Sequence, residues 1–307
     1  MIFLPAVLAR LDIIAEYTTQ YSFVCIATTN PVYLVFKEGC NTPDFVIKTL
    51  TSEQAFAAWE TQQQLYKLVP ALIAEPLQIV DELGSYYSIE KGATGFPWFQ
   101  VKQRFSGRAW QKLQSDAIQC LCELHQAIAL NSQWQKYLAP VEILAEIFED
   151  YCAVEGAVSE QLQHFYKIQS SLLASVSAIQ CTKQHGDFCL NNLLLGEDQL
   201  TVIDFEDFGI TMLPLFDEFN LALSLLSNNS NRGEISNLIK QCTDSALARY
   251  QIEPALLPAF FLGYLLLKLG KWSLPGKRQA HRGWLQRLLA DFLAHPTEYF
   301  GTAGNRL

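Results

Sequence analysis

Residues 184–209 read QHGDFCLNNLLLGEDQLTVIDFEDFG and interrupt a part of the chain whose pattern is otherwise mostly helical. In the middle of this stretch, two apolar runs, 193–195 and 200–203, flank a polar turn that contains Gly and Asp. This pattern predicts a β-hairpin. Because a hairpin brings its outer ends together, we expect Asn192 to lie beside Asp204, with the loop that carries Asp187 at the same edge.

Two carboxylates and a carboxamide at one edge form a candidate site for a metal and a phosphate. Such oxygen ligands suit Mg²⁺, which usually keeps several waters and is completed by substrate phosphates. A further carboxylate that does not hold the metal can accept the proton of a hydroxyl nucleophile. Phosphoryl transfer needs this combination of an oriented nucleophile and charge on the phosphates. The alternative is a purely structural role, in which these Asp and Asn residues only cap a buried loop.

The same residues carry a resemblance to a known family. His185-Gly186-Asp187, with Asn192 five residues after the aspartate, resembles the catalytic loop of the aminoglycoside phosphotransferase and choline kinase family. Residues 202–206 are similar to the metal-binding segment of that family, and residues 214–217 continue in the same way.

The resemblance implies an α+β, two-lobed protein-kinase-like fold that uses ATP or GTP with Mg²⁺. It makes Asp187 the catalytic base and His185 a support for the loop, with Asn192 and Asp204 as metal ligands. Residues 207–209 spell Asp-Phe-Gly, the metal triplet of protein kinases, but Asp204 follows the apolar run directly. Both the hairpin and the family spacing favour Asp204, so Asp207 is a secondary candidate.

The first ninety residues predict a small antiparallel sheet with one helix. Runs of β-branched and aromatic residues separated by turn residues are typical of strands. Strands are expected at 22–27, 31–37, 45–48, 77–80 and 86–89, and a helix capped by Thr51 or Ser52 is expected to run to about residue 68. Gly92, Gly95 and Pro97 then break the pattern. We therefore expect a nucleotide-binding lobe at residues 1–89 and a larger, mainly helical lobe at residues 90–307 with the catalytic loop and the acceptor site.

Lys48 ends the third predicted strand, where a lysine can be an ordinary surface residue. By the resemblance it reaches the nucleotide phosphates, and an acid on the following helix is its partner. Glu53 and Glu60 are seven residues apart and share a helix face, so the period of the helix does not choose between them. The position of Glu60 ahead of two leucines is similar to the family pattern and favours it.

Two further segments are candidates for nucleotide contacts. The turn at residues 27–30 would cover the phosphates with its backbone amides and with the hydroxyls of Thr28 and Thr29, although it lacks the glycine that the family often has there. Residues 87–92 look like the hinge, where the backbone of Ile89 and Glu90 would meet the purine. A plain edge strand is the alternative.

The second lobe is predicted to be helical. Apolar residues at helical spacing indicate helices at 113–129, 141–154, 160–176, 216–226 and 258–269. The most apolar run, 255–267, contains Pro258 and stops at Lys268. It is too short to span a bilayer and is expected to be a core helix.

Composition excludes several classes of function. The chain has 22 Lys and Arg against 31 Asp and Glu, a net charge of −9, so it is a poor candidate for binding nucleic acid. Eight cysteines without a CxxC pair indicate reduced thiols rather than zinc or a disulfide scaffold. We expect no signal peptide and no membrane partner, and we expect the protein to be cytoplasmic. The P-loop and the GxGxxG dinucleotide motif are both missing.

The sequence therefore predicts a kinase that moves the γ-phosphate of ATP or GTP to a hydroxyl of a small molecule. Acidic residues at 206, 207, 217 and 218 are compatible with a cationic acceptor such as an aminoglycoside or an amino alcohol, and a sugar-like polyol is equally compatible. One alternative is a non-catalytic nucleotide-binding or scaffold protein on the same fold. A metal-dependent hydrolase that uses His185 ranks lower, because it lacks further well-placed histidines. The sequence leaves the oligomeric state open.

Overall fold

The computed structural model describes residues 4–10, 21–26, 31–197, 199–226, 230–272 and 279–300. The chain folds as two compact units, the first formed by Met1–Ala127 with Leu190–Phe208 and the second by Ile128–Cys189 with Gly209–Leu307. The boundaries of these units differ from the boundary between the predicted lobes, 1–89 and 90–307. Those lobes were assigned by expected function, nucleotide binding against catalysis, and this division stays a prediction.

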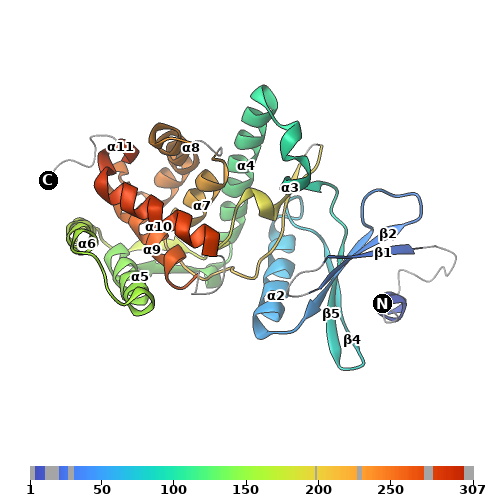
Figure 1. Ribbon diagram of the computed structural model, residues 1–307. Coiled ribbons are helices and arrows are strands. Elements are labelled where there is room, and N and C mark those ends of the chain that lie inside the picture. The colour runs from blue at the N-terminus through green and yellow to red at the C-terminus, as the bar shows by residue number, and fades with distance from the viewer. Residues whose placement is uncertain are drawn as a thin grey trace. The chain divides into compact units, whose positions relative to one another are not determined.

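The first unit is built on a five-stranded antiparallel sheet (Figure 1). Its strands follow the predicted runs of β-branched and aromatic residues. In spatial order they are β1 (Tyr21–Ile26), β2 (Val32–Lys37), β3 (Phe45–Leu50), β5 (Ser85–Lys91) and β4 (Pro76–Glu82). The first helix, α1 (Leu4–Ala9), contributes Leu4 and Val7 to the apolar cluster on this sheet. The prediction of a small antiparallel sheet is confirmed.

Helix α2 (Glu53–Leu68) follows β3 and begins as predicted. Ser52 caps it, since its hydroxyl accepts a hydrogen bond from the Ala55 N–H at 3.2 Å. The buried side chains of the helix are Ala55, Trp59, Gln62 and Leu65. A polar residue, Gln62, therefore faces the interior of the first unit.

The predicted hairpin is present in the first unit. β9 (Leu193–Leu195) pairs antiparallel with β10 (Leu200–Val202), and β9 also pairs with β6 (Phe96–Pro97). The hairpin is fixed to the loop before β4, because the Val202 N–H donates to the Leu72 carbonyl at 2.8 Å. Helices α3 (Trp98–Val101) and α4 (Gly107–Ile128) follow β6, joined by a 3₁₀ turn at Lys102–Arg104.

The second unit is mainly helical and is organised around α9 (Leu257–Leu269), every residue of which is buried. Helices α5, α6, α7, α10 and α11 all pack against α9. Their bounds are α5 (Pro140–Glu155), α6 (Glu160–Leu173), α7 (Phe216–Ser224), α10 (Gln279–Ala294) and α11 (Pro296–Phe300). A two-stranded ladder of β7 (Gln135–Leu138) with β8 (Ile179–Thr182) completes the unit, together with 3₁₀ turns at Ser132–Trp134 and Pro254–Leu256.

The expected core helix is confirmed as α9. The other predicted helices also form. Most of their ends lie within two residues of the expected ones, but α6 ends three residues earlier and α4 begins six residues earlier. Helix α8 (Arg232–Tyr250) was not expected. In the described part of the chain, no single helix has the length and apolarity to cross a bilayer, and the one pair that passes together, α8 with Pro254–Leu269, is bent by 117°. None of the eight cysteines forms a disulfide.

Candidate active site

The loop that carries Asp187 is held in the second unit by a buried carboxylate. Asp217, at the start of α7, accepts hydrogen bonds from the His185 N–H at 2.6 Å and the Gly186 N–H at 3.0 Å. Gly186 has a φ of 86°, a left-handed conformation that glycine adopts without strain. The side chain of Asp217 is fully buried. Asp217 therefore holds the turn of the loop, and is not only a residue at the start of a helix.

His185 shapes the same loop from within. It is fully buried, and its Nδ1 accepts a hydrogen bond from the Asp187 N–H at 3.3 Å. Its ring also packs edge-on against Phe188, with 5.8 Å between ring centroids. These contacts agree with a supporting role, in which His185 acts on the backbone of Asp187 and its ring holds the loop.

The carboxylate of Asp187 is held by two side chains from distant helices. Oδ1 accepts hydrogen bonds from Lys268 Nζ of α9 at 3.2 Å and from Asn220 Nδ2 of α7 at 3.3 Å. Asn220 also donates to the Phe188 carbonyl at 3.1 Å, so it ties the side chain of Asp187 to its own loop. Asp187 keeps 21% of its side chain exposed, while Lys268 is fully buried. The accessible group of this pair is the carboxylate.

Tyr264 of α9 completes the network. Its hydroxyl donates to Asn220 Oδ1 at 3.2 Å, which orients the carboxamide with its N–H₂ toward Asp187. Burial raises the pKa of Tyr264 well above 10, and the negative charge of Asp187 raises it further. Tyr264 therefore remains protonated and a hydrogen-bond donor at neutral pH.

In the first unit, the hairpin places the two predicted metal ligands at its open end. The register pairs Leu193 with Val202, and the Ile203 N–H donates to the Asn192 carbonyl at 3.0 Å, so Asn192 and Asp204 lie at the same end. The backbone of Asp204 has a φ of 67°, a left-handed conformation that is uncommon outside glycine and recurs at functional sites. Asp204 is exposed and Asn192 is buried.

The chemistry of these two side chains fits magnesium. A carboxylate and a carboxamide supply the oxygen atoms that Mg²⁺ prefers, and Mg²⁺ is usually held by one or two carboxylates together with phosphates and water. Within the described ranges, no group of three or more His, Cys, Asp and Glu side chains is placed to hold a metal ion. Asp207, the secondary candidate, lies half-buried in the turn after Asp204.

The predicted phosphate-binding lysine has an acidic partner, and that partner is Glu90. Lys48 Nζ lies 2.9 Å from Oε1 and 3.1 Å from Oε2 of Glu90. Gln62 of α2 donates to Glu90 Oε2 at 2.6 Å and to the Ala74 carbonyl at 3.0 Å. The expectation that Glu60 holds Lys48 is therefore corrected. Glu60 and Glu53 are exposed on α2, because the buried face of this helix carries Gln62.

The predicted hinge residues lie inside the sheet. Ile89 and Glu90 on β5 are in register with β3 on one side and with β4 on the other. Their backbone N–H and C=O groups therefore point at neighbouring strands. The side chain of Glu90, and not its backbone, reaches Lys48. The other predicted nucleotide contacts, Thr28 and Thr29, lie outside the described residues.

A family model matches the part of the sequence that carries most of these residues. The model described as the phosphotransferase enzyme family matches residues 49–231, which include Asp187, Asn192 and Asp204. The chain belongs to the phosphotransferase enzyme family. No curated protein matches the sequence. The resemblance to aminoglycoside phosphotransferases and choline kinases is confirmed at the level of the family.

Solved structures similar to this phosphotransferase share its fold at low sequence identity. A choline/ethanolamine kinase family protein from Mesorhizobium loti is 14% identical, with a TM-score of 0.59 over 97% of both chains. A candidate fructosamine-3-kinase from Thermobifida fusca is 16% identical, with a TM-score of 0.54 over 90% of this chain and 92% of that one. A glucosamine kinase in complex with glucosamine, ADP and inorganic phosphate is 15% identical, with a TM-score of 0.51 over 90% of this chain and 83% of that one. The phosphotransferase therefore has the α+β, protein-kinase-like fold.

Six polar side chains of this arrangement were not expected in their observed roles. They are Gln62, Glu90, Asp217, Asn220, Tyr264 and Lys268. Lys268 left a signal in the sequence, because a single charge at the end of the most apolar run indicates a buried cation that needs a partner. Gln62 and Asn220 left none, since nothing in their neighbouring residues distinguishes them from other polar residues on a helix.

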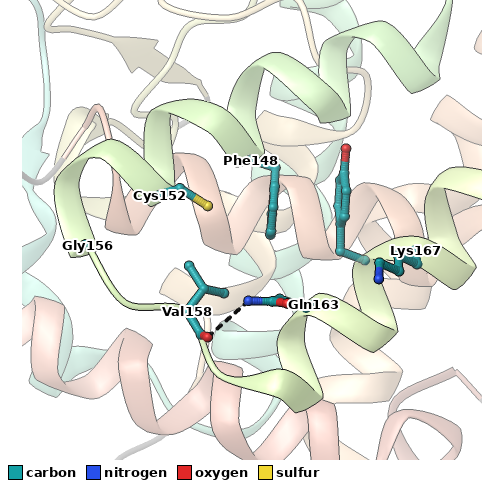
Figure 2. Close-up of a pocket in the computed structure, with 7 residues that line it drawn as sticks. Phe148, Cys152, Gly156, Val158, Gln163 and Lys167 are labelled. Atoms are coloured by element: carbon teal, nitrogen blue, oxygen red, sulfur yellow. Dashed lines mark hydrogen bonds between the residues drawn. The ribbon is translucent and has the colours of Figure 1, made fainter.

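A separate cavity lies where the end of α5 meets α6 (Figure 2). It has a volume of about 300 Å³, and the rings of Phe148 and Tyr166, stacked at 3.9 Å between centroids, form one wall. Gln163 closes part of it by donating to the Val158 carbonyl at 3.3 Å. No predicted catalytic, nucleotide-binding or metal-binding residue lines this cavity, and it is not part of the candidate active site.

Proposed function

We propose that this phosphotransferase is a magnesium-dependent small-molecule kinase that moves the γ-phosphate of ATP or GTP to an acceptor hydroxyl. The observation that carries the proposal is the way in which Asp187 is held by its neighbours. Its loop is clamped by a buried Asp217, and its carboxylate is fixed by Lys268 and Asn220 while remaining accessible. Asp187 is thus held in one orientation while its carboxylate stays open to an acceptor hydroxyl.

In this reaction Asp187 orients the acceptor hydroxyl and takes its proton. The acceptor oxygen forms a bond to the γ-phosphorus, the bond from that phosphorus to the bridging oxygen breaks, and the nucleoside diphosphate leaves. Asn192 and Asp204 would hold Mg²⁺, which when bound offsets the negative charge of the phosphates. Lys48, kept in place by Glu90, would contact the phosphates.

The acceptor is a small molecule with a hydroxyl. The similar solved structures include kinases whose descriptions name choline or ethanolamine and glucosamine. An aminoglycoside, an amino alcohol or a sugar-like polyol all carry the group that the mechanism requires. Membership of the family supports this class of acceptor.

A thermal melt with nucleotides tests the proposal. A nucleotide that binds only the folded protein raises the melting temperature. ATP, GTP and ADP would each be added with and without Mg²⁺ to the wild type, Asp204→Asn and Asp207→Asn. We expect a magnesium-dependent rise with at least one nucleotide in the wild type and in Asp207→Asn, and its loss in Asp204→Asn. Equal loss in both variants would contradict the assignment of Asp204.

The competing function is a non-catalytic nucleotide-binding or scaffold protein on the same fold. It is favoured by the turn at residues 27–30, which has no glycine to let the backbone approach phosphates. A nucleotide-dependent rise in melting temperature without any ADP release, under every acceptor tried, would favour the binding protein. No rise with any nucleotide would favour the scaffold and refute the kinase.

A further inference from the structure

Lys268 is a buried cation at the end of the most apolar helix of the second unit. Every residue of α9 is buried, and the side chain of Lys268 has no exposure. An ammonium group removed from water is strongly destabilising unless it is paired. The groups that pair with the ammonium therefore hold it in place, and they indicate the function of Lys268.

Those groups include a carboxylate and two aromatic rings. Nζ of Lys268 lies 3.2 Å from Asp187 Oδ1, 3.4 Å from the centroid of the Trp272 ring and 5.5 Å from that of Phe216. A carboxylate beside an aromatic face is the usual environment for a bound ammonium ligand, because both the charge and the ring quadrupole attract a cation. Here the protein's own side chain fills that environment.

The acidic residues of α7 likewise already have partners. Asp217 is buried and holds the amides of the catalytic loop. Glu218 is paired with Arg249, whose guanidinium lies 2.7 Å from its carboxylate. In this unit, the carboxylates that suggested a cationic acceptor from sequence therefore have structural partners.

We propose that Lys268 is a specificity-determining residue that selects acceptors without an ammonium group close to the reacting hydroxyl. This inference rests on the proposed function and narrows it. In an amino alcohol such as choline or ethanolamine, the nitrogen is two carbons from the hydroxyl. A hydroxyl placed at Asp187 would bring that nitrogen close to Lys268, where the two positive charges repel. Neutral polyols and sugars carry no such charge.

Matched acceptors of equal shape and different charge test this inference. The pairs are choline with 3,3-dimethylbutan-1-ol, ethanolamine with propan-1-ol, and 2-aminopropane-1,3-diol with glycerol, and in each cationic member the nitrogen is two carbons from the hydroxyl. ADP release from the magnesium nucleotide would be followed, and kcat/KM compared within each pair. For each pair with turnover, we expect the wild type to prefer the neutral member by about tenfold or more. Preference for the cationic member would overturn the inference without any variant being made.

Variants of Lys268 separate charge from structure. Lys268→Met should reduce the preference to about threefold or less, because an acceptor ammonium can then supply the missing positive charge. Lys268→Arg should retain the preference, and Lys240→Met, an exposed lysine on α8, is the matched control. A general loss of activity lowers both members of a pair equally and leaves their ratio unchanged. An unchanged ratio in a folded Lys268→Met protein would therefore refute the role.

The nucleotide melt distinguishes the two levels of failure. Nucleotide binding with no turnover of any neutral acceptor would overturn the inference about Lys268, because the neutral class would then not be the substrate. Absence of nucleotide binding would overturn the proposed kinase function, and the inference with it.

Discussion

The clamp of Asp217 on the loop that carries Asp187 gives a prediction whose size follows from the structure. Asp217→Ala removes the acceptor of two buried N–H groups, those of His185 and Gly186. A buried donor left without a partner costs about 1–3 kcal/mol, so the two together should lower the free energy of unfolding by about 2–6 kcal/mol. Asp217→Asn retains one acceptor oxygen and should cost about half as much. Against a typical total of about 5–15 kcal/mol, both losses are large.

Urea denaturation measures this loss, and amide hydrogen exchange locates it. The N–H groups of His185 and Gly186 should exchange much faster in Asp217→Ala, because opening of the loop no longer breaks a charge-assisted bond. Asp244→Ala, an exposed aspartate on α8, is the control and should change stability by less than about 0.5 kcal/mol. A cost below about 1 kcal/mol with unchanged exchange at both amides would refute the clamp.

Three further predictions follow from other charged and thiol groups. Glu90→Ala removes the carboxylate that pairs with Lys48 and should lower stability by about 1–3 kcal/mol in urea denaturation, while Glu60→Ala should be nearly neutral. Hydrogen bonds from Arg232 lower the pKa of Asp291 from 3.8 to about 2, so its stabilisation is present above about pH 4 and is lost as the pH falls toward about 2. Arg232→Met should therefore flatten the fall of the melting temperature in that window, and a curve parallel to the wild type would contradict this. Burial raises the pKa of Cys120 to about 12, so iodoacetamide at about pH 8 should label the exposed cysteines in the folded protein and leave Cys120 unmodified by mass spectrometry.

Sequence patterns predicted those parts of the fold that depend on neighbouring residues. The five strands, the Ser52 cap and the hairpin that joins Asn192 to Asp204 each follow from a local pattern. A strand alternates with a period of two, and a hairpin is defined by its turn, so a short segment contains the necessary information. The proposed catalytic role of the loop around Asp187 likewise rests on several residue identities at fixed spacing within one short segment.

The partner of Lys48 shows where local reasoning fails. The sequence offered two acids on α2, Glu53 and Glu60, but both are exposed, and the buried face of the helix runs through Gln62. Successive residues on a helix differ by about 100° in direction, so Glu60, two residues before Gln62, points well away from the buried face. The correct partner, Glu90, is on a strand 42 residues away, and no helix periodicity can identify it.

Lys268 shows a different reason for failure and indicates how it can be overcome. It is separated from Asp187 by 81 residues, so its partner cannot be read from the sequence around it. Its burial, however, could be read, because α9 is apolar throughout and a charge within it must be paired. Asp187, which the sequence already predicts to be catalytic, is a carboxylate of the same unit as Lys268. A lone charge in an apolar core helix should therefore be matched first against the predicted catalytic residues, since an active site is where a protein retains a buried ion pair despite its destabilising desolvation.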